Sequence, residues 1–157
     1  TGKNSLASTL PYLPKKNKIQ FVHNTFTTGE EIDEAMEYNK NIFWCFCPNA
    51  NLYIENRLPD LKMFYDKKLK CTIGTDSLAS NHQLSMLEEM KTIQKNFSSI
   101  PLWEIICWAT LNGAELLDFS QQLGSIEKNK TSGLVLINDV DLSSMRLTEK
   151  SKATRLI

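Results

Sequence analysis

Apolar runs that end in polar residues recur along the first half of the chain, and a helical pattern follows each of them. The runs lie at residues 19–23, 42–47 and 71–76. The first alternates between apolar and polar positions, whereas the second is apolar on both faces, as in a parallel strand that is covered on both sides. This succession of strands and helices predicts an α/β fold with a parallel sheet.

The helical segments carry their own start signals. A threonine at residues 27–28 opens the first helix, with glutamates at residues 30–31 placed for a capping box. We read the polar stretch at residues 49–51 as a loop. A second helix is expected after it, at about residues 59–67. The third should leave Glu88 and Glu89 on a solvated face and bury one apolar stripe, made of Leu84, Leu87, Met90 and Ile93. Pro101 is suited to the first turn of a fourth.

From Leu123 onward the pattern changes to short apolar runs around Lys- and Asn-rich turns. Strands are expected at residues 124–127 and 133–137, with a last one near residues 153–157. We therefore expect two parts, an α/β body at residues 1–118 and a small β appendage at residues 119–157.

Composition narrows the class of protein. A chain of 157 residues is long enough to bury about 70% of its unfolded surface in a core. Its 18 basic and 18 acidic residues give a formal net charge of zero, which offers no attraction for nucleic acid or for anionic membranes. No apolar run approaches the ~20 residues of a membrane span. A polyanionic partner is therefore not expected.

The four cysteines do not form the paired spacings of a zinc module, and a chain of this length needs no disulfide scaffold. We expect reduced thiols and a cytoplasmic protein, with Cys45 and Cys47 as small core residues. Thr1 is not an initiator methionine, which suggests a segment of something longer.

Polar residues at the carboxyl ends of the predicted strands are the candidates for chemistry. In a parallel barrel, His23, residues 47–51 and Asp76 would share the face on which active sites are built. Asp76 there could ligate a divalent metal and take a proton from the bound water. His23 could hold a second metal, orient the water or polarise the bond being hydrolysed, and the sequence leaves these three roles open.

Simpler interpretations stand beside these roles. A strand-end aspartate commonly caps a helix or forms a turn, and His23 could be a buried histidine with a hydrogen-bond partner. His82 lies in a polar loop, where a surface or capping role is the default. Since a catalytic zinc takes three protein ligands, Asp76 and His23 do not complete its shell.

Several specific motifs occur in a fixed order along the chain. The most specific is Gly-Thr-Asp-Ser-Leu-Ala-Ser-Asn at residues 74–81, followed by Leu-Glu-Glu-Met at 87–90. The others are Phe-Val-His-Asn at 21–24, Cys-Pro-Asn-Ala-Asn at 47–51, Ala-Thr-Leu-Asn-Gly-Ala at 109–114, and Leu-Gly-Ser-Ile-Glu at 123–127 with Leu-Val-Leu-Ile at 134–137. Together these motifs resemble the amidohydrolase superfamily, specifically its chlorohydrolase, cytosine deaminase and guanine deaminase-like branch.

The resemblance implies the C-terminal part of a (β/α)8 barrel, about strands six to eight, plus part of a small β-sandwich at residues 119–157. By it, Asp76 ligates a divalent metal, zinc or iron, and shuttles protons, while His23 contacts substrate or water and in some members also metal. The substrate pocket would be lined by Asn49, Asn51, Ser80 and Asn81. The implied reaction is hydrolysis of a carbon–nitrogen bond, most simply deamination of an aminated heterocycle by metal-activated water.

Departures from the family pattern shape what we expect of this chain alone. Its members carry a His-x-His pair on strand one and another histidine on strand five, and nothing here can supply them, because His23 and His82 are the only histidines of the sequence. Those ligands must lie upstream or be absent, so the chain alone should be incomplete and inactive, and should pair with the N-terminal half of the same barrel or form a homo-oligomer. Phe46 also stands where many relatives have histidine before Cys-Pro.

Two alternatives to a metal-dependent hydrolase remain. One is a catalytically degenerate scaffold or binding protein. The other is a metal-independent hydrolase in which Cys47 is the nucleophile and His23 its base.

Overall fold

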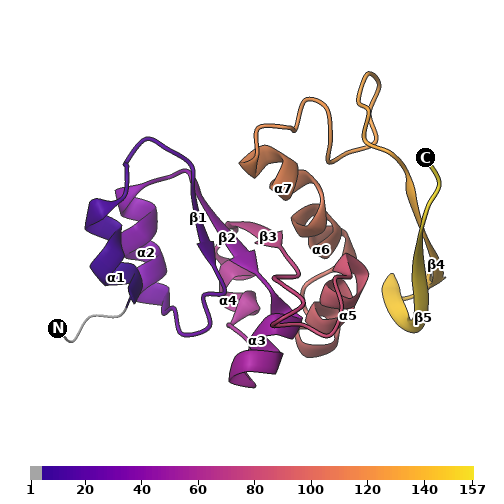
Figure 1. The fold of residues 1–157 in the computed structure, drawn as a ribbon, viewed down its shortest axis with the longest axis horizontal. Coiled ribbons are helices and arrows are strands. Elements are labelled where there is room, and N and C mark those ends of the chain that lie inside the picture. The colour runs from indigo at the N-terminus through magenta and orange to yellow at the C-terminus, as the bar shows by residue number, and fades with distance from the viewer. Residues whose placement is uncertain (1–4) are drawn as a thin grey trace.

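A parallel sheet of three strands lies at the centre of the chain's N-terminal part (Figure 1). The computed structural model describes residues 5–157. The sheet has the order β1-β2-β3, and its strands are β1 (Ile19–Val22), β2 (Ile42–Phe46) and β3 (Lys70–Ile73). Phe21 pairs with Trp44, and Trp44 in turn pairs with Cys71. The predicted parallel sheet and its βα rhythm are confirmed.

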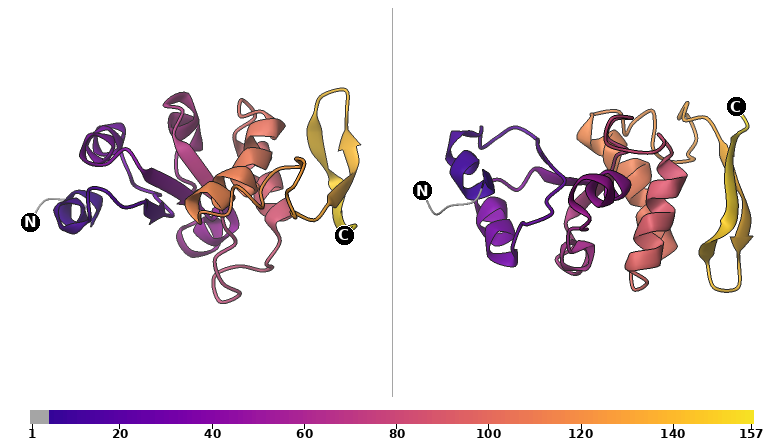
Figure 2. Two further views of the ribbon diagram at one scale, coloured as in Figure 1. Left: turned by 90° about the horizontal axis from the view of Figure 1, so that it is seen from above. Right: turned by 60° about the horizontal axis from the view of Figure 1, so that its bottom comes forward.

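Helices surround this sheet. They are α1 (Ser5–Thr9) with the 3₁₀ turn η1 (Leu10–Tyr12), α2 (Gly29–Tyr38), α3 (Pro48–Glu55), α4 (Leu61–Asp66), α5 (Met86–Asn96), α6 (Leu102–Ala109) and α7 (Leu111–Leu116). In all views α1 and α2 lie at the N-terminal end of the molecule, beside β1, and α5 to α7 lie on the side toward the C-terminus (Figure 2).

An antiparallel hairpin of β4 (Val135–Asp141) and β5 (Arg146–Arg155) ends the chain and lies apart from the central sheet (Figure 1). It is attached to α5 through Gln94, whose Nε2 donates to the carbonyl of Leu147 at 2.9 Å while its Oε1 accepts from the amide of Leu147 at 2.8 Å. Both the Gln94 and Leu147 side chains are buried. These two buried bonds fix the hairpin to the body, and Ile137 and Val140 of β4 pack against the same core.

The core is aromatic and centres on β2, which is buried at all five positions. The Phe64 ring of α4 lies 5.2 Å from Trp44 and 4.9 Å from Phe46, and Phe46 lies 6.2 Å from Trp108 of α6, measured between ring centroids. Tilted and edge-on pairs of this kind add to the free energy gained by burial alone. The apolar character of β2 on both faces is thus explained by its two sets of contacts. Trp44 and Phe46 pack against the helices, and Cys45 belongs to a separate buried cluster with Cys47 and Ala50.

The helix start signals agree with the sequence. Thr28 is the N-cap of α2: its side chain accepts from the amide of Glu31, and the Glu31 carboxylate accepts from the amide of Thr28. Ser85 caps α5 by accepting from the amide of Glu88. Because α5 begins after this cap, Leu84 lies outside it and is 56% exposed, so its assignment to the buried stripe was wrong. Leu87, Met90 and Ile93 are buried as expected.

Four further expectations need correction. Residues 49–51 are not a loop: Pro48 occupies the first turn of α3, where a missing N–H costs nothing. Residues 124–127 form no strand, because the chain turns at Gly124 with a φ of 91°. The last strand begins at Arg146, well before residue 153. Glu89, expected on a solvated face, is completely buried.

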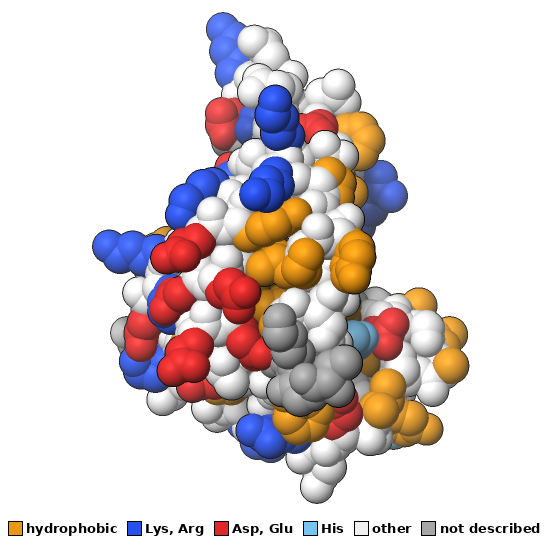
Figure 3. All heavy atoms as spheres, turned by 90° about the vertical axis from the view of Figure 1, so that its left-hand side faces the viewer, with side chains coloured by type: hydrophobic (Ala, Val, Ile, Leu, Met, Phe, Trp, Pro, Cys, Tyr) orange, Lys and Arg blue, Asp and Glu red, His pale blue; other side chains and the backbone are white. Residues whose placement is uncertain are grey.

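Charged and apolar side chains are segregated on the face that carries α1 and α2. Acidic side chains gather along one flank, and hydrophobic side chains form a patch beside them (Figure 3). The acidic residues of α2 are Glu30, Glu31, Asp33, Glu34 and Glu37. Across residues 5–157, no helix combines the length and the apolar character that crossing a membrane would require.

Candidate functional site

His23 and Asp76 meet at the carboxyl edge of the central sheet. His23 directly follows β1, and Asp76 follows β3 by three residues, on either side of β2. The distance from His23 Nε2 to Asp76 Oδ2 is 4.0 Å, and their side chains are 39% and 34% exposed. The structure therefore brings the two sequence-predicted residues together at a solvent-accessible edge, as strands of a parallel sheet should.

Both residues have left-handed backbone conformations. The φ angle is 70° at His23, 57° at Asn24 and 56° at Asp76. Non-glycine residues rarely adopt such angles, which cost free energy unless the surroundings hold them. The turn after β1 is held by β2: the carbonyl of Cys45 accepts from the amide of His23 at 2.9 Å and from Asn24 Nδ2 at 3.3 Å.

The turn that carries Asp76 is held by the next polar residues of its loop. Ser80 Oγ donates to Asp76 Oδ2 at 2.6 Å, and Asn81 Nδ2 donates to the carbonyl of Thr75 at 2.8 Å. Within residues 5–157, no hydrogen bond reaches Asp76 Oδ1. That oxygen is free to take a ligand or a proton at the exposed edge.

The amides that the sequence places in the substrate pocket lie beneath the edge and bond to protein. Asn51, which is 2% exposed, donates from Nδ2 to Thr25 Oγ1 at 2.6 Å. Asn49 accepts from Thr92 Oγ1 at 2.6 Å. Ser80 and Asn81 are 8% and 5% exposed. Contact of these four side chains with a substrate stays a prediction.

Glu89 is the polar residue that the sequence interpretation missed. Its carboxylate accepts from the amide of Asn49 at 2.9 Å and from Asn81 Nδ2 at 2.7 Å. Burial raises the pKa of Glu89, and these donors act against that rise. Helical spacing could have found it, because residue 89 shares a face with Met86 and Ile93, at i−3 and i+4.

Two thiols lie under the site. A Cβ built on Gly74 would lie 3.4 Å from both Cys45 Sγ and Cys47 Sγ, so the glycine leaves room for them. A hydrogen bond from Cys47 lowers the pKa of Cys45 to about 7, whereas the pKa of Cys47 is raised by that bond and by burial. Cys47 is only 3% exposed. These properties describe a protonated, enclosed thiol and argue against Cys47 as a nucleophile.

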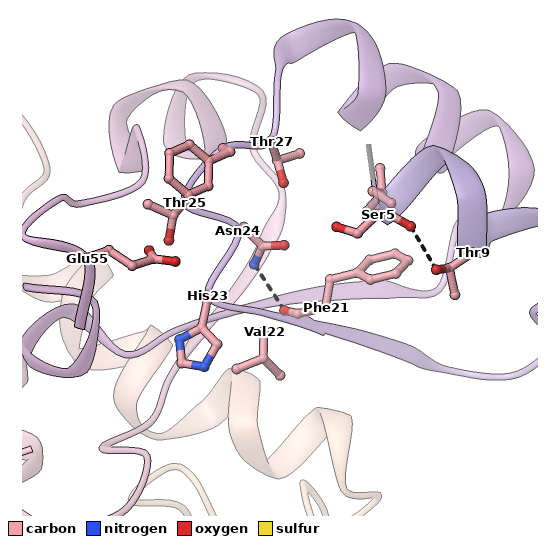
Figure 4. A pocket seen from close by; sticks show the side chains of 11 residues that line it. Ser5, Thr9, Phe21, Val22, His23, Asn24, Thr25, Thr27 and Glu55 are labelled. Atoms are coloured by element: carbon pink, nitrogen blue, oxygen red, sulfur yellow. Dashed lines mark hydrogen bonds between the residues drawn. The ribbon is translucent and has the colours of Figure 1, made fainter. Parts of the chain in front are cut away.

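A cavity of about 330 Å³ opens beside His23 (Figure 4). It lies between α1, β1 and the loop that follows β1, and Glu55 of α3 reaches into it from the opposite side. Its wall near the sheet edge consists of Val22, His23 and Asn24. The histidine therefore faces an open space large enough for a small molecule.

The donor atoms of the site suit a divalent metal in part. An imidazole nitrogen and a carboxylate oxygen are both ligands that zinc accepts, and 4.0 Å does not exceed the sum of two bonds of about 2.0–2.2 Å. In the part of the chain that the structure describes, however, no group of three or more His, Cys, Asp and Glu side chains could hold an ion. His23 and Asp76 thus fit as two ligands of a larger set.

Comparison with known proteins agrees with this geometry. In parallel barrels the active site is built at the carboxyl ends of the strands, which is where His23 and Asp76 lie. The amidohydrolase family model matches residues 6–154. The chain belongs to the amidohydrolase family and has its fold, which is of the TIM-barrel type.

Curated relatives of this chain are deaminases. It is 31% identical over 130 residues to the 5-methylthioadenosine/S-adenosylhomocysteine deaminase of Teredinibacter turnerae, covering 77% of this chain and 29% of the relative. It is 32% identical over 124 residues to the adenosine deaminase of Helicobacter pylori, covering 76% of this chain and 30% of the relative. The chain thus spans less than a third of the length of these relatives.

Solved structures give the same picture. A zinc-bound adenosine deaminase from Xanthomonas campestris superposes with a TM-score of 0.68 at 29% identity, covering 82% of this chain and 30% of that one. Guanine deaminase of E. coli superposes with a TM-score of 0.66 at 26% identity, covering 78% and 29%.

Proposed function

We propose that this chain supplies part of the active site of a hydrolase that removes an amino group from a purine-like heterocycle. The observation that carries the proposal is the approach of His23 Nε2 to Asp76 Oδ2, at 4.0 Å, at the carboxyl edge of a parallel sheet. The names of the relatives support the reaction class, since they act on adenosine, its thioether derivatives or guanine.

Each residue has a role in this proposal. Asp76 is a metal ligand and the group that takes a proton, through the Oδ1 atom that no other residue described here engages. His23 lies across the cavity mouth and orients the substrate or the attacking water. A bound divalent metal, zinc or iron, would be held by Asp76 and by His23 in some states, and would supply a water of lowered pKa. Ser80 fixes the orientation of the Asp76 carboxylate.

The site is completed, in our proposal, by the N-terminal half of the same barrel, with β1, β2 and β3 as strands six, seven and eight. Both outer strands of the sheet have an open edge, and Val22 on β1 is 47% exposed. Open edges and an exposed apolar strand invite pairing with further strands. Residues 1–118 would then be barrel and residues 119–157, with the β4–β5 hairpin, part of a small β-sandwich.

The segment alone is expected to be inactive and either marginally stable or oligomeric. Light scattering on the isolated chain tests this directly. A compact, stable monomer would contradict the view that its edges need partners. A cytoplasmic location, which fits reduced thiols, is open to test by cell fractionation.

The reaction is tested with the complete gene product, loaded with zinc or with iron. Ammonia release is measured from adenosine, 5-methylthioadenosine, S-adenosylhomocysteine, guanine and cytosine. Asp76→Asn should lower the rate by about 100-fold or more, since a group that transfers protons contributes about 10²–10⁴-fold. Asp66→Asn, an exposed carboxylate paired with Lys62, is the matched control and should leave the rate unchanged. No ammonia from any of these substrates would overturn the proposal.

A second candidate is a catalytically degenerate scaffold or binding protein. It is favoured by the finding that residues 5–157 contain no complete metal-ligand group. Metal content by mass spectrometry separates the two candidates. About one metal ion per complete chain supports the hydrolase, whereas none after exposure to zinc and iron supports the scaffold.

A further inference from the structure

Helix α3 is tied to both of the loops that carry the candidate chemistry. It begins immediately after β2, the middle strand, and therefore stands between the His23 loop and the Asp76 loop. One buried hydrogen bond runs from α3 to the first loop, and a chain of three runs from α3 to the second. The bond from Asn51 to Thr25 and the bond from Asn81 to Glu89 are buried, which shields them from competing water.

The tie to the His23 loop is made by Asn51. Its Nδ2 donates to Thr25 Oγ1 at 2.6 Å, and both residues are buried, at 2% and 8% exposure. Thr25 lies two residues after His23, within the turn whose backbone is left-handed. Holding Thr25 therefore limits where that turn can place the imidazole.

The tie to the Asp76 loop is made by Glu89 of α5. Glu89 Oε2 accepts from the amide of Asn49, in the first turn of α3, and Glu89 Oε1 accepts from Asn81 Nδ2. The same Asn81 Nδ2 donates to the carbonyl of Thr75, the residue before Asp76. Three hydrogen bonds of 2.7–2.9 Å thus lead from α3 to the backbone of the Asp76 turn.

A carboxylate is the side chain that this position requires. The amide of Asn49 is one of the N-terminal donors of α3 that have no partner within the helix, and Cys47, the N-cap, offers no side-chain bond. Glu89, which belongs to another helix, takes the place of the missing cap. Its carboxylate is stabilised by the positive end of the α3 dipole. Both of its oxygens meet donors, so a glutamine, with one oxygen and one NH₂ group, would leave one donor unpaired.

We propose that Asn51 and Glu89 are positioning residues, which act through Thr25 and Asn81 to set the separation of His23 and Asp76. This inference rests on the proposed function for its catalytic consequence, although the positioning itself does not. It gives Asn51 and Asn81 a role other than direct contact with substrate. The loop of the left-handed His23 turn is bonded to α3 directly, and the Asp76 turn is connected to α3 through Asn81 and Glu89. These connections to one helix hold the two turns at their distance.

The first test measures backbone protection by hydrogen–deuterium exchange in the complete gene product. Glu89→Gln should speed exchange in residues 75–81 and leave residues 23–28 unchanged. Thr25→Val and Asn51→Leu should do the reverse. Glu88→Gln, one residue along α5 and paired with Lys91 at 2.8 Å, away from both loops, is the matched control and should change neither. Equal effects of Glu89→Gln on both loops, or on neither, would overturn the inference.

The second test separates kcat from KM for the deaminated substrate. A displacement of about 1 Å in a reacting group can cost about 100-fold in rate. Glu89→Gln and Thr25→Val should therefore lower kcat by about 10- to 100-fold with KM within about twofold, while Glu88→Gln keeps both. A rise in KM at constant kcat would instead assign these residues to substrate binding and overturn the inference.

The two tests distinguish a failure of the positioning inference from a failure of the proposed function. If no substrate is deaminated but exchange changes loop by loop as described, the positioning holds and the proposed function fails. If the protein deaminates a substrate but Glu89→Gln behaves as Glu88→Gln in both measurements, the proposed function holds and the positioning fails.

Discussion

The Phe46 ring stands edge-on against the Phe64 ring, with centroids 4.9 Å apart and an interplanar angle of 72°. Phe46 is completely buried and also neighbours Trp108. Successive side chains of a strand point to opposite faces, so Cys45 and Cys47 lie on the other face of β2, in a cluster with Ala50. Phe46, at the position where the family resemblance leads us to expect histidine, is therefore a core residue here.

Removing this ring should destabilise the protein strongly. Phe46→Ala is expected to lower the free energy of unfolding by about 3–5 kcal/mol, the range found for buried phenylalanines. Chemical denaturation of the complete gene product measures it. Phe26→Ala, at a ring that is 62% exposed, is the control and should cost no more than about 1 kcal/mol. Equal costs at the two positions would contradict the core assignment.

Gly124 is required by both backbone angle and space. Its φ is 91°, and a Cβ there would lie 2.8 Å from Ala114 Cβ and 2.9 Å from Leu111 Cα. Gly124→Ala should destabilise the protein by about 1–3 kcal/mol, because the strain and the clash with backbone add. The measurement is the midpoint of thermal unfolding.

Gly113 provides the matched comparison for this substitution. It lies inside α7, and a Cβ there would meet nothing within 4 Å. Gly113→Ala is expected to raise the free energy of unfolding by about 0.5–1 kcal/mol, since glycine disfavours a helix by that amount. Opposite signs at the two glycines would establish that the effect is local geometry.

Asp141 should titrate at an unusually low pH. Hydrogen bonds from Ser143 and Ser144 lower the pKa of its carboxyl from 3.8 to about 2. A lowered pKa means that the folded hairpin favours the carboxylate, so this stabilisation is present above pH 3.8 and is lost as the pH falls through about 2. Carbon NMR of the Asp141 carboxyl measures the pKa. The double variant Ser143→Ala with Ser144→Ala should return it toward 3.8, and an unchanged value would contradict the assignment.

Cys45 should ionise near neutral pH because Cys47 donates to its thiolate. With Cys47→Ala, the pKa of Cys45 should rise from about 7 toward the ordinary 9, because the largest cause of its lowering is lost while burial still raises it. Cys47→Ser keeps a hydroxyl donor and should keep the pKa low. Carbon NMR of the Cys45 Cβ follows the titration, and equal midpoints in the two variants would contradict the hydrogen bond.

The strands were predictable because their signal is local. Alternation of apolar and polar residues identifies Ile19–Val22 as a strand, and continuous apolar character identifies Ile42–Phe46. The polar residues that follow these strands must lie at one edge of a parallel sheet. The meeting of His23 and Asp76 followed from that topology alone. The capping box at Thr28 was equally local.

The missed features depend on contacts between distant residues. Helical spacing places Glu89 on the buried face of α5, but the donors that hold its carboxylate there come from α3 and from the Asp76 loop, and the sequence does not show that they converge on it. Residues 49–51 have turn-forming side chains, yet tertiary packing places Ala50 and Asn51 in a buried helix. At residues 124–127 the apolar pattern resembled a strand, but the close approach of Gly124 to α7 imposes a turn.

At His23 and Asp76 the left-handed backbone costs stability, whereas the side chains carry the chemistry proposed for the site. Glycine would relax each turn, because it adopts a φ near 60° without strain. Selection for heat resistance alone would therefore favour glycine at both positions. The fold would gain stability, and the imidazole and the carboxylate would be lost. That both side chains remain on disfavoured backbone is what a site maintained for its reaction, and not for its stability, would look like.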